Sequence, residues 1–142
     1  MQARRILVPL AGTSADPDVI RVAATIAKPA KAAVLAVHVI EVRWNMPLDA
    51  VLDAESEHGE QLLEHATAVA SQLGVNIETE LLQAREAAAA IIDTARERDV
   101  DLIVLGMPFR KRLGRVYVGR TVQNVYVGAH CAVLAYRQEE VG

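Results

Sequence analysis

The sequence predicts an α/β fold in which a parallel sheet is covered by helices on both faces. Short apolar runs alternate with helical patterns from one end of the chain to the other. The central runs are apolar throughout, as expected of strands that are buried on both faces. Parallel strands need a crossover between them, and an alternation of strand and helix supplies it.

Five segments are predicted to be strands. Residues 5–10 are a short apolar run that stops at a glycine-containing turn, and residues 32–40 (AAVLAVHVI) are nearly all apolar. Residues 75–82 alternate in polarity, with two glutamates on one side, which indicates a strand at a sheet edge with one face in water. Residues 102–105 and 132–136 complete the set.

Four segments carry the periodicity of amphipathic helices. The first opens at Asp16, whose carboxylate is expected to cap the free amides of the helix. The others are expected at residues 54–73, 85–98 and 121–127. Residues 42–53 have no clear periodicity and exceed the usual length of a connection, so we expect a loop that lies over a ligand or a neighbouring subunit.

Length and composition limit the class of protein. A chain of 142 residues, 52% of them hydrophobic, fits one domain spanning residues 1–142. The net charge of −3 argues against general nucleic-acid binding. No apolar run approaches the roughly 20 residues of a membrane span, and no signal peptide is recognisable. The single cysteine, Cys131, is expected to be a buried thiol and suits the reducing cytoplasm, where we expect the protein.

Four segments, in this order, resemble the universal stress protein family. They are RILVPL at residues 5–10, HVIE at 38–41, DLIVLG at 101–106 and GRTVQNVYVGAHCAV at 119–133. The resemblance covers essentially the whole chain. It implies a five-stranded parallel sheet in the order 3-2-1-4-5, of the Rossmann-like or adenine nucleotide alpha hydrolase-like type. It also implies a role in the stress response and a homodimer formed through the last strand.

In nucleotide-binding members of this family, adenosine lies over the carboxyl ends of strands 1, 2 and 4, and the phosphates lie on a glycine-containing loop. Carried over by position, the resemblance implies a nucleotide-binding set consisting of Pro9, Leu10, Ala11, Val39, Gly106, Gly119, Arg120 and Thr121. Such a site is physically reasonable, because strand ends flank a crevice and a helix N-terminus directs amides at an anion.

Three positions depart from the family pattern. Ala11 stands where the family has an adenosine-binding aspartate, Phe109 replaces the second loop glycine, and Arg120 replaces a serine or threonine. The side chain of Phe109 is expected to obstruct the approach of backbone to phosphate. Weak ATP binding, or an altered pose, is therefore expected. The sequences of several segments also resemble a subset of the family that lacks the usual ATP loop. Domains similar to this subset are appended to amino-acid permeases.

Basic residues cluster in the loop before the last helix. Arg110, Lys111, Arg112, Arg115 and Arg120 lie within eleven positions of an otherwise acidic chain. With the following helix N-terminus they predict an anion site, for which ATP, AMP or a cyclic dinucleotide are candidate ligands. A solvated charged loop, or a loop that contacts a protein partner, is the alternative.

No spacing of side chains predicts a catalytic or metal site. His58 and His65 are too few to hold a metal, and the adjacent His130 and Cys131 would point to opposite faces of a strand. His38 is expected to be a satisfied residue of the core or rim. We therefore expect a non-catalytic regulatory domain whose ligand orders the loops 42–53 and 107–118. The alternatives are an interaction domain without a small ligand, docked on a partner such as a transporter, and a slow nucleotide hydrolase.

Overall fold

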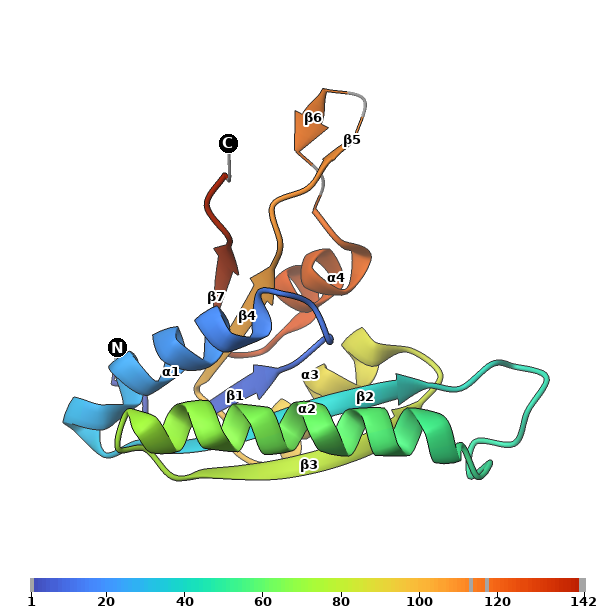
Figure 1. The fold of residues 1–142 in the computed structure, drawn as a ribbon, viewed down its shortest axis with the longest axis horizontal. Helices are drawn as coiled ribbons and strands as arrows, with labels where there is room; N and C mark the ends of the chain where they lie inside the picture. Colours follow the sequence, from blue (N-terminus) through green and yellow to red (C-terminus); the bar gives the residue numbers. More distant parts are fainter. Residues whose placement is uncertain (1, 113, 117, 141–142) are drawn as a thin grey trace.

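The computed structural model describes residues 2–112, 114–116 and 118–140, without the side chains of residues 111, 112, 115 and 116. Figure 1 shows the strands and helices in their order along the chain. They are β1 (Arg5–Pro9), α1 (Asp16–Ala30), β2 (Ala33–Glu41), α2 (Asp53–Gln72), β3 (Ile77–Ala84), α3 (Ala87–Glu97), β4 (Leu102–Met107), β5 (Lys111–Arg112), β6 (Arg115–Val116), α4 (Arg120–Gly128) and β7 (Ala132–Arg137).

Five of the strands form one parallel sheet in the order β3-β2-β1-β4-β7. Because β7 is the fifth strand of this sheet along the chain, the expected order 3-2-1-4-5 is confirmed. Helices α1 and α2 cover one face, and α3 and α4 cover the other (Figure 1). The predicted fold class is therefore confirmed. Among the described residues, no helix combines the length and the apolar character needed to cross a membrane.

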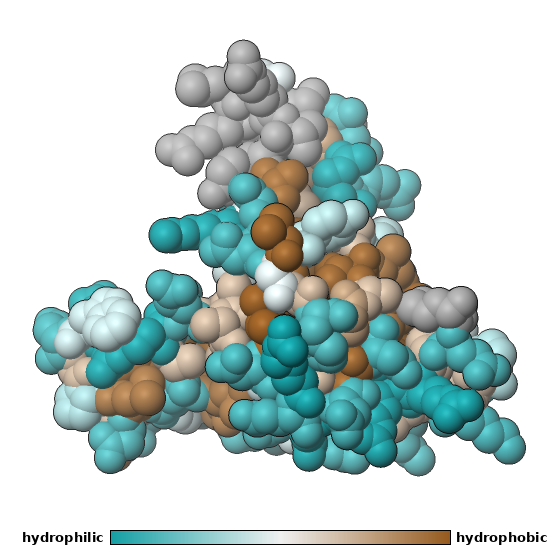
Figure 2. Space-filling model, turned by 180° about the vertical axis from the view of Figure 1, so that it is seen from behind, coloured by the Kyte–Doolittle hydropathy of each residue, from teal (hydrophilic) through white to brown (hydrophobic). Residues whose placement is uncertain are grey.

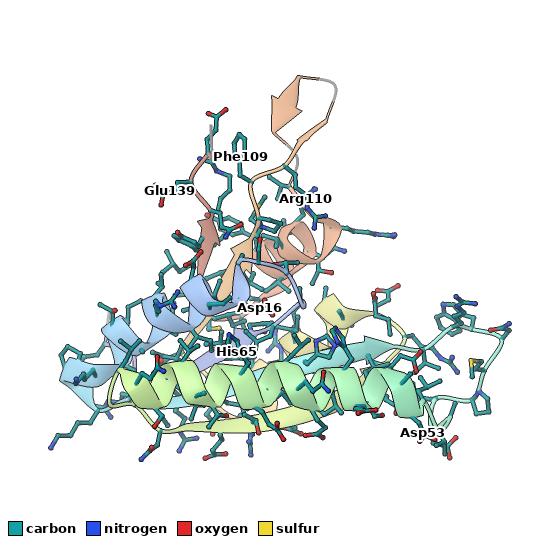
Figure 3. The ribbon with its side chains drawn as sticks, in the orientation of Figure 1. Asp16, Asp53, His65, Phe109, Arg110 and Glu139 are labelled. Carbon is teal, nitrogen blue, oxygen red and sulfur yellow. The ribbon has the colours of Figure 1, made fainter. Side chains whose placement is uncertain are left out.

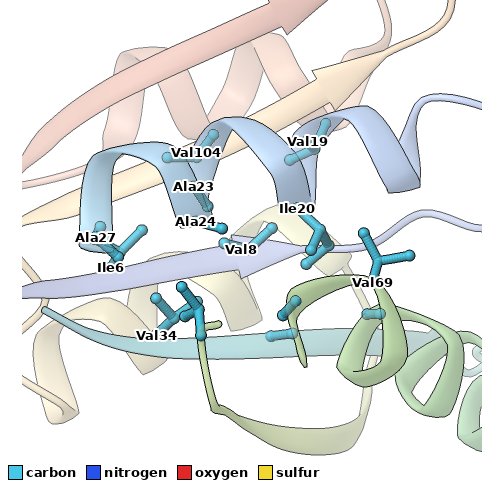
Figure 4. Close-up of a cluster of buried hydrophobic side chains, with 14 of the residues drawn as sticks. Ile6, Val8, Val19, Ile20, Ala23, Ala24, Ala27, Val34, Val69 and Val104 are labelled. Carbon is cyan, nitrogen blue, oxygen red and sulfur yellow. The ribbon is translucent and has the colours of Figure 1, made fainter. Parts of the chain in front are cut away.

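The pleat of β1 divides the core between the two faces of the sheet. Ile6 and Val8 pack with α1 and α2 in the cluster drawn in Figure 4, whereas Leu7 packs with α3 and α4. All three are at most 1% exposed. Successive side chains of a strand point to opposite faces, so an uninterrupted apolar run supplies both halves of the core.

The two edges of the sheet differ in chemistry. Strand β3 forms one edge, as predicted from its alternating polarity, and carries Glu78 and Glu80, whose carboxylates lie 3.2 and 3.8 Å from the guanidinium of Arg98. Strand β7 forms the other edge, and three of its four exposed residues, Ala132, Leu134 and Ala135, are apolar, the fourth being Arg137 at its end. One edge is therefore charged and the other is mostly apolar.

Some boundaries differ from those that the sequence predicts. Strand β3 begins at Ile77 and runs to Ala84, and α3 begins at Ala87 because Glu86 is extended. Arg85 therefore lies in the junction between β3 and α3, outside the helix. The structure also adds an antiparallel pair, β5 and β6, which was not predicted because two-residue strands rich in charge leave no strand pattern.

The prediction that Asp16 caps α1 is wrong. The N-cap residue of α1 is Ala15, whose amide donates to the hydroxyl of Thr13 at 3.2 Å. Asp16 is the first residue of the helix. The carboxylate of Asp16 turns back and accepts hydrogen bonds from the amides of Ala11 and Gly12. Because the helix begins one residue earlier than expected, this side chain binds amides of the loop before the helix and does not cap the helix.

Candidate functional site

Two adjoining pockets open at the carboxyl ends of β1, β2 and β4. The first has a volume of about 170 Å³ and an apolar lining apart from His38, Glu41 and Thr121. The second, of about 210 Å³, is bounded by the end of β4, the loop after it and the first residues of α4. The two share Ala11, Gly106, Thr121 and Val122, so we describe them together as the crevice. The strand order changes direction here, and ligands of open α/β sheets bind at such points.

The crevice brings together the residues that the family resemblance implies. The first pocket is lined by six of them: Pro9, Leu10, Ala11, Val39, Gly106 and Thr121. The second is lined by Gly119 and Arg120, together with Arg110 from the predicted anion-binding loop. Arg112 and Arg115 belong to β5 and β6, and their side chains lie outside the described part of the chain. That these residues bind a ligand stays a prediction.

The polar side chains of the first pocket hold its walls in place. His38 Nδ1 lies 2.7 Å from the carbonyl oxygen of Leu10, so this nitrogen carries the proton and donates. The carboxylate of Glu41 accepts a hydrogen bond of 3.0 Å from the amide of Ala87, the first residue of α3. The prediction that His38 is a satisfied residue is therefore confirmed. Both side chains position neighbouring elements and thus preform the pocket.

The two glycines of the crevice are glycine for different reasons. A Cβ atom on Gly106 would lie 1.8 Å from Cγ2 of Val19, so α1 can pack on β4 only if this residue has no side chain. A Cβ on Gly119 would meet no atom within 4 Å, and its φ of −61° suits any residue. The fold therefore requires Gly106, whereas Gly119 leaves open space at the second pocket.

Phe109 does not obstruct the crevice, so that expectation is wrong. The Cζ atom of Arg137, at the end of β7, lies 4.8 Å from the centre of the Phe109 ring, a cation–π contact. Figure 3 shows Phe109 between its loop and the segment after β7, with Arg110 on the side of α4. Pro108 and Arg110 line the second pocket there, and Phe109 does not.

The second pocket is electrostatically suited to an anion. Helix α4 begins at Arg120 without a side-chain cap and without an acidic residue in its first turn. The first amides of a helix have no partner within the helix and form its positive end. Arg110 and Arg120 add two guanidinium groups to the same pocket. A phosphate or carboxylate here would be stabilised by amides and arginines together.

Residues 42–52 form an arch that extends from the carboxyl end of β2 (Figure 1). The guanidinium of Arg85 donates to the carbonyl oxygens of Arg43 and Met46, at 2.6 and 2.8 Å, and its Cζ lies 4.9 Å from the centre of the Trp44 ring. The amide of Gln83 donates to two further carbonyls of the arch, at 3.0 and 3.1 Å. The arch is held by the protein itself, a role of Arg85 that its place in the sequence did not indicate.

Other candidate side chains form no reactive group. Cys131 is half-buried, less than expected, and burial raises the pKa of its thiol. The rings of His38 and His58 meet edge to face, with their centres 6.5 Å apart. Within the described ranges, no three histidine, cysteine or acidic side chains are grouped so that they could hold a metal ion.

The fold and the crevice define an α/β domain with a preformed cavity at the switch point of a parallel sheet. The chain belongs to the universal stress protein family, whose sequence profile matches residues 2–137. The identification made from the four segments is thereby confirmed. A universal stress protein of Methanocaldococcus jannaschii is 29% identical over 141 residues, which cover 95% of this chain and 82% of that protein.

A second relative is an antiporter that this chain matches over part of its length. A Na(+)/H(+) antiporter of Synechocystis is 30% identical over 134 residues, which cover 93% of this chain and 19% of the antiporter. Among solved structures, the universal stress protein UspA of Lactobacillus plantarum has a TM-score of 0.80 at 29% identity, covering 95% of this chain and 98% of that one. One from Archaeoglobus fulgidus, in complex with dAMP, has a TM-score of 0.75 at 23% identity, covering 95% and 98%.

Proposed function

We propose that this protein is a single cytoplasmic regulatory domain whose crevice binds an adenine-type or other phosphate-bearing ligand. The observation that carries the proposal is the pairing of an apolar pocket with a pocket formed by arginines and a helix N-terminus. A flat heterocycle suits the first pocket and a phosphate suits the second. The dAMP complex of the Archaeoglobus fulgidus protein supports the proposal, since that protein has the same fold.

The composition of the crevice favours weak binding or an altered pose. Ala11 lines both pockets with a methyl group, at the position where the family resemblance leads us to expect an aspartate. A ligand therefore lacks one polar anchor there. The open space at Gly119 and the guanidinium of Arg120 favour contacts on the α4 side instead. We infer that the phosphate contributes more to binding than the heterocycle does.

A regulatory role fits the polar groups of the crevice better than catalysis does. His38 and Glu41 are the groups of the first pocket that could act as acid or base, and both are engaged with backbone atoms. A general base must reach the proton that it removes from a substrate. Their hydrogen bonds favour a structural role for both, and ATP, AMP and cyclic dinucleotides are the ligands to test.

Replacing Arg110 and Arg120 together by alanine is expected to abolish the stabilisation of the fold by phosphate and AMP. A ligand that binds only the folded state raises the free energy of unfolding by about 2.7 kcal/mol at a concentration 100 times its Kd. The double variant R110A/R120A should show almost none of this increase in thermal unfolding or calorimetry. Without ligand its stability should change little, because exposed charges contribute little by themselves.

The matched control is the double variant R4A/R96A, which removes the same charge from exposed residues outside the crevice. It should keep the full response to phosphate and AMP. Equal responses of the two double variants would remove the ligand site from the second pocket. Chromatography that leaves stoichiometric ATP on the purified protein would contradict the expectation of weak binding.

A protein-interaction domain is the second candidate function. Three large apolar side chains of the arch are exposed: Trp44 to 78%, Leu48 to 48% and Val51 to 84%. Arg85 and Gln83 hold this segment in place, as a docking surface requires. The match to part of an antiporter makes a transporter a reasonable partner. Thermal unfolding with phosphate, ATP, AMP and cyclic dinucleotides separates the two candidate functions, because an interaction domain gains no stability from these ligands.

We also propose a homodimer formed through the open edge of β7, and the variant L134K is expected to make it a monomer. Unpaired strand edges attract other strands, and a lysine on the edge prevents this pairing. Apolar side chains gather in the middle of the view in Figure 2. Near this edge, Tyr126 and Val127 of α4 and Leu134 of β7 itself are exposed large hydrophobic side chains. Light scattering should give twice the mass of one chain for the natural protein.

The control is V51K, which places the same charge on an equally apolar but distant site of the arch. It should remain dimeric. If V51K is a monomer and L134K is a dimer, the two copies meet through the arch and the proposed interface is wrong.

A further inference from the structure

Two backbone amides after β1 converge on one carboxylate. The amide of Ala11 donates to Oδ1 of Asp16 at 3.3 Å, and the amide of Gly12 donates to Oδ2 at 3.0 Å. Gly12 has a φ of +80°, a left-handed conformation that glycine adopts without strain. Successive amides arranged in this way form an anion-binding concavity. In this protein the anion is supplied by the chain itself.

The carboxylate is held in place by the start of α1. Asp16 is the first residue of that helix, and its own amide donates to the carbonyl oxygen of Thr13 at 3.1 Å. Burial raises the pKa of Asp16, and the hydrogen bonds from Gly12 and Ala11 and the nearby ring of His38 act in the opposite direction. The fold thus keeps a partly buried carboxylate at these amides.

The side chain of Asp16 lies outside the crevice. Its side chain lines a separate pocket of about 240 Å³ between the start of α1 and α2, together with Leu62 and His65 of α2 (Figure 3). It lines neither pocket of the crevice, whereas its partner Ala11 lines both. Asp16 therefore does not replace the carboxylate that position 11 lacks. Its effect on the crevice passes through the backbone of the loop.

We propose that Asp16 is a positioning residue that determines where the crevice can bind an anionic group. By occupying the amides of Ala11 and Gly12 with its own charge, it leaves the amino end of α4 as the place for a ligand phosphate. A phosphate at the amides of Ala11 and Gly12 would meet the negative charge of Asp16, and both amides already have an acceptor. This inference rests on the proposed function, since it states which side of the same crevice holds the phosphate.

The test is an NMR titration of backbone amides with inorganic phosphate. In the natural protein, phosphate should shift the amides of Thr121 and Val122 and leave those of Ala11 and Gly12 unchanged. In the variant D16A the vacated amides should respond to phosphate as well, and their hydrogen exchange without phosphate should be at least about 10-fold faster. D16N, which keeps the shape and removes the charge, should show the same effects to a smaller degree and is measured if D16A does not fold.

The control is D18A, which removes the other carboxylate from the first turn of α1. Asp18 contacts Arg21 and Gln138 and does not contact the loop amides, so D18A should behave as the natural protein does. The proposal is overturned if phosphate shifts Ala11 and Gly12 in the natural protein, or if these amides are silent in D16A and D16N. A different result would overturn the α4 site of the proposed function instead. In that result phosphate does not shift the amides of Thr121 and Val122 in the natural protein, although it shifts those of Ala11 and Gly12 in D16A.

Discussion

Gly106→Ala is expected to lower the free energy of unfolding by about 3 kcal/mol or more, because overpacking a filled core typically costs 1–3 kcal/mol and occasionally more. The added methyl would lie 1.8 Å from Cγ2 of Val19 and 3.6 Å from Cβ of Ala15, both buried residues of or next to α1. Relief requires α1 to move away from β4. Denaturation followed by circular dichroism measures the effect.

Gly119→Ala is the matched control, since it adds the same methyl in open space on the same crevice. It should cost less than about 1 kcal/mol, the usual effect of a less favourable N-cap residue. A similar loss in both variants would mean that the contact between α1 and β4 does not explain why position 106 is glycine.

Arg85→Ala is expected to release the arch and to lower the free energy of unfolding by about 2 kcal/mol, since a hydrogen bond from a charged group typically contributes 1.5–3 kcal/mol. Arg85 is half-buried, and its guanidinium holds the carbonyls of Arg43 and Met46 and the ring of Trp44. Limited proteolysis should then cut within residues 43–51 much faster than in the natural protein. Arg85→Lys should restore little, because an ammonium group lacks the planar fork that reaches several acceptors.

Arg98→Ala removes a guanidinium of the same type whose side chain is 46% exposed and whose partners are the carboxylates of Glu78 and Glu80. Its cost should stay below about 1 kcal/mol, the usual limit for exposed ion pairs. An arch that resists proteolysis equally in R85A and R98A would falsify the assignment of Arg85 as its anchor.

The strands could be predicted because burial on both faces leaves a local pattern. Ile6, Leu7 and Val8 alternate between the two halves of the core, so the run has to be apolar at every position. The order of the strands has no such local pattern, and it followed from the family resemblance. The edge position of β3 was predictable, because Glu78 and Glu80 mark a face that water reaches.

The contacts that the sequence did not reveal join residues far apart in the chain or reach backward along it. Arg85 binds backbone carbonyls about forty positions away, and any donor of suitable length could do so. Asp16 has the residue type and place of a helix cap, yet its carboxylate accepts from amides that precede the helix. Phe109, in the loop after β4, contacts Arg137 at the end of β7, which lies 28 positions further along the chain.

The family resemblance grouped the site residues in advance, and the structure places them at or near the carboxyl ends of β1, β2 and β4 or at the start of α4. The carboxyl ends of β1, β2 and β4 meet at one edge of a parallel sheet, so residues just after these strands have to be neighbours. The arginines between β4 and α4 and at the first position of α4 follow no such rule, because a long connection leaves the direction of each side chain open. Arg110 and Arg120 reach the crevice.

The difference between the two sheet edges limits how far the protein can polymerise. If two copies join through β7, the continuous sheet that they form ends in β3 on both sides. Each of these ends carries Glu78 and Glu80, and like charges discourage a further copy from adding its own β3. Growth would therefore stop at a closed pair and would not continue into a fibre, so the apolar edge can serve assembly without making the protein prone to aggregation.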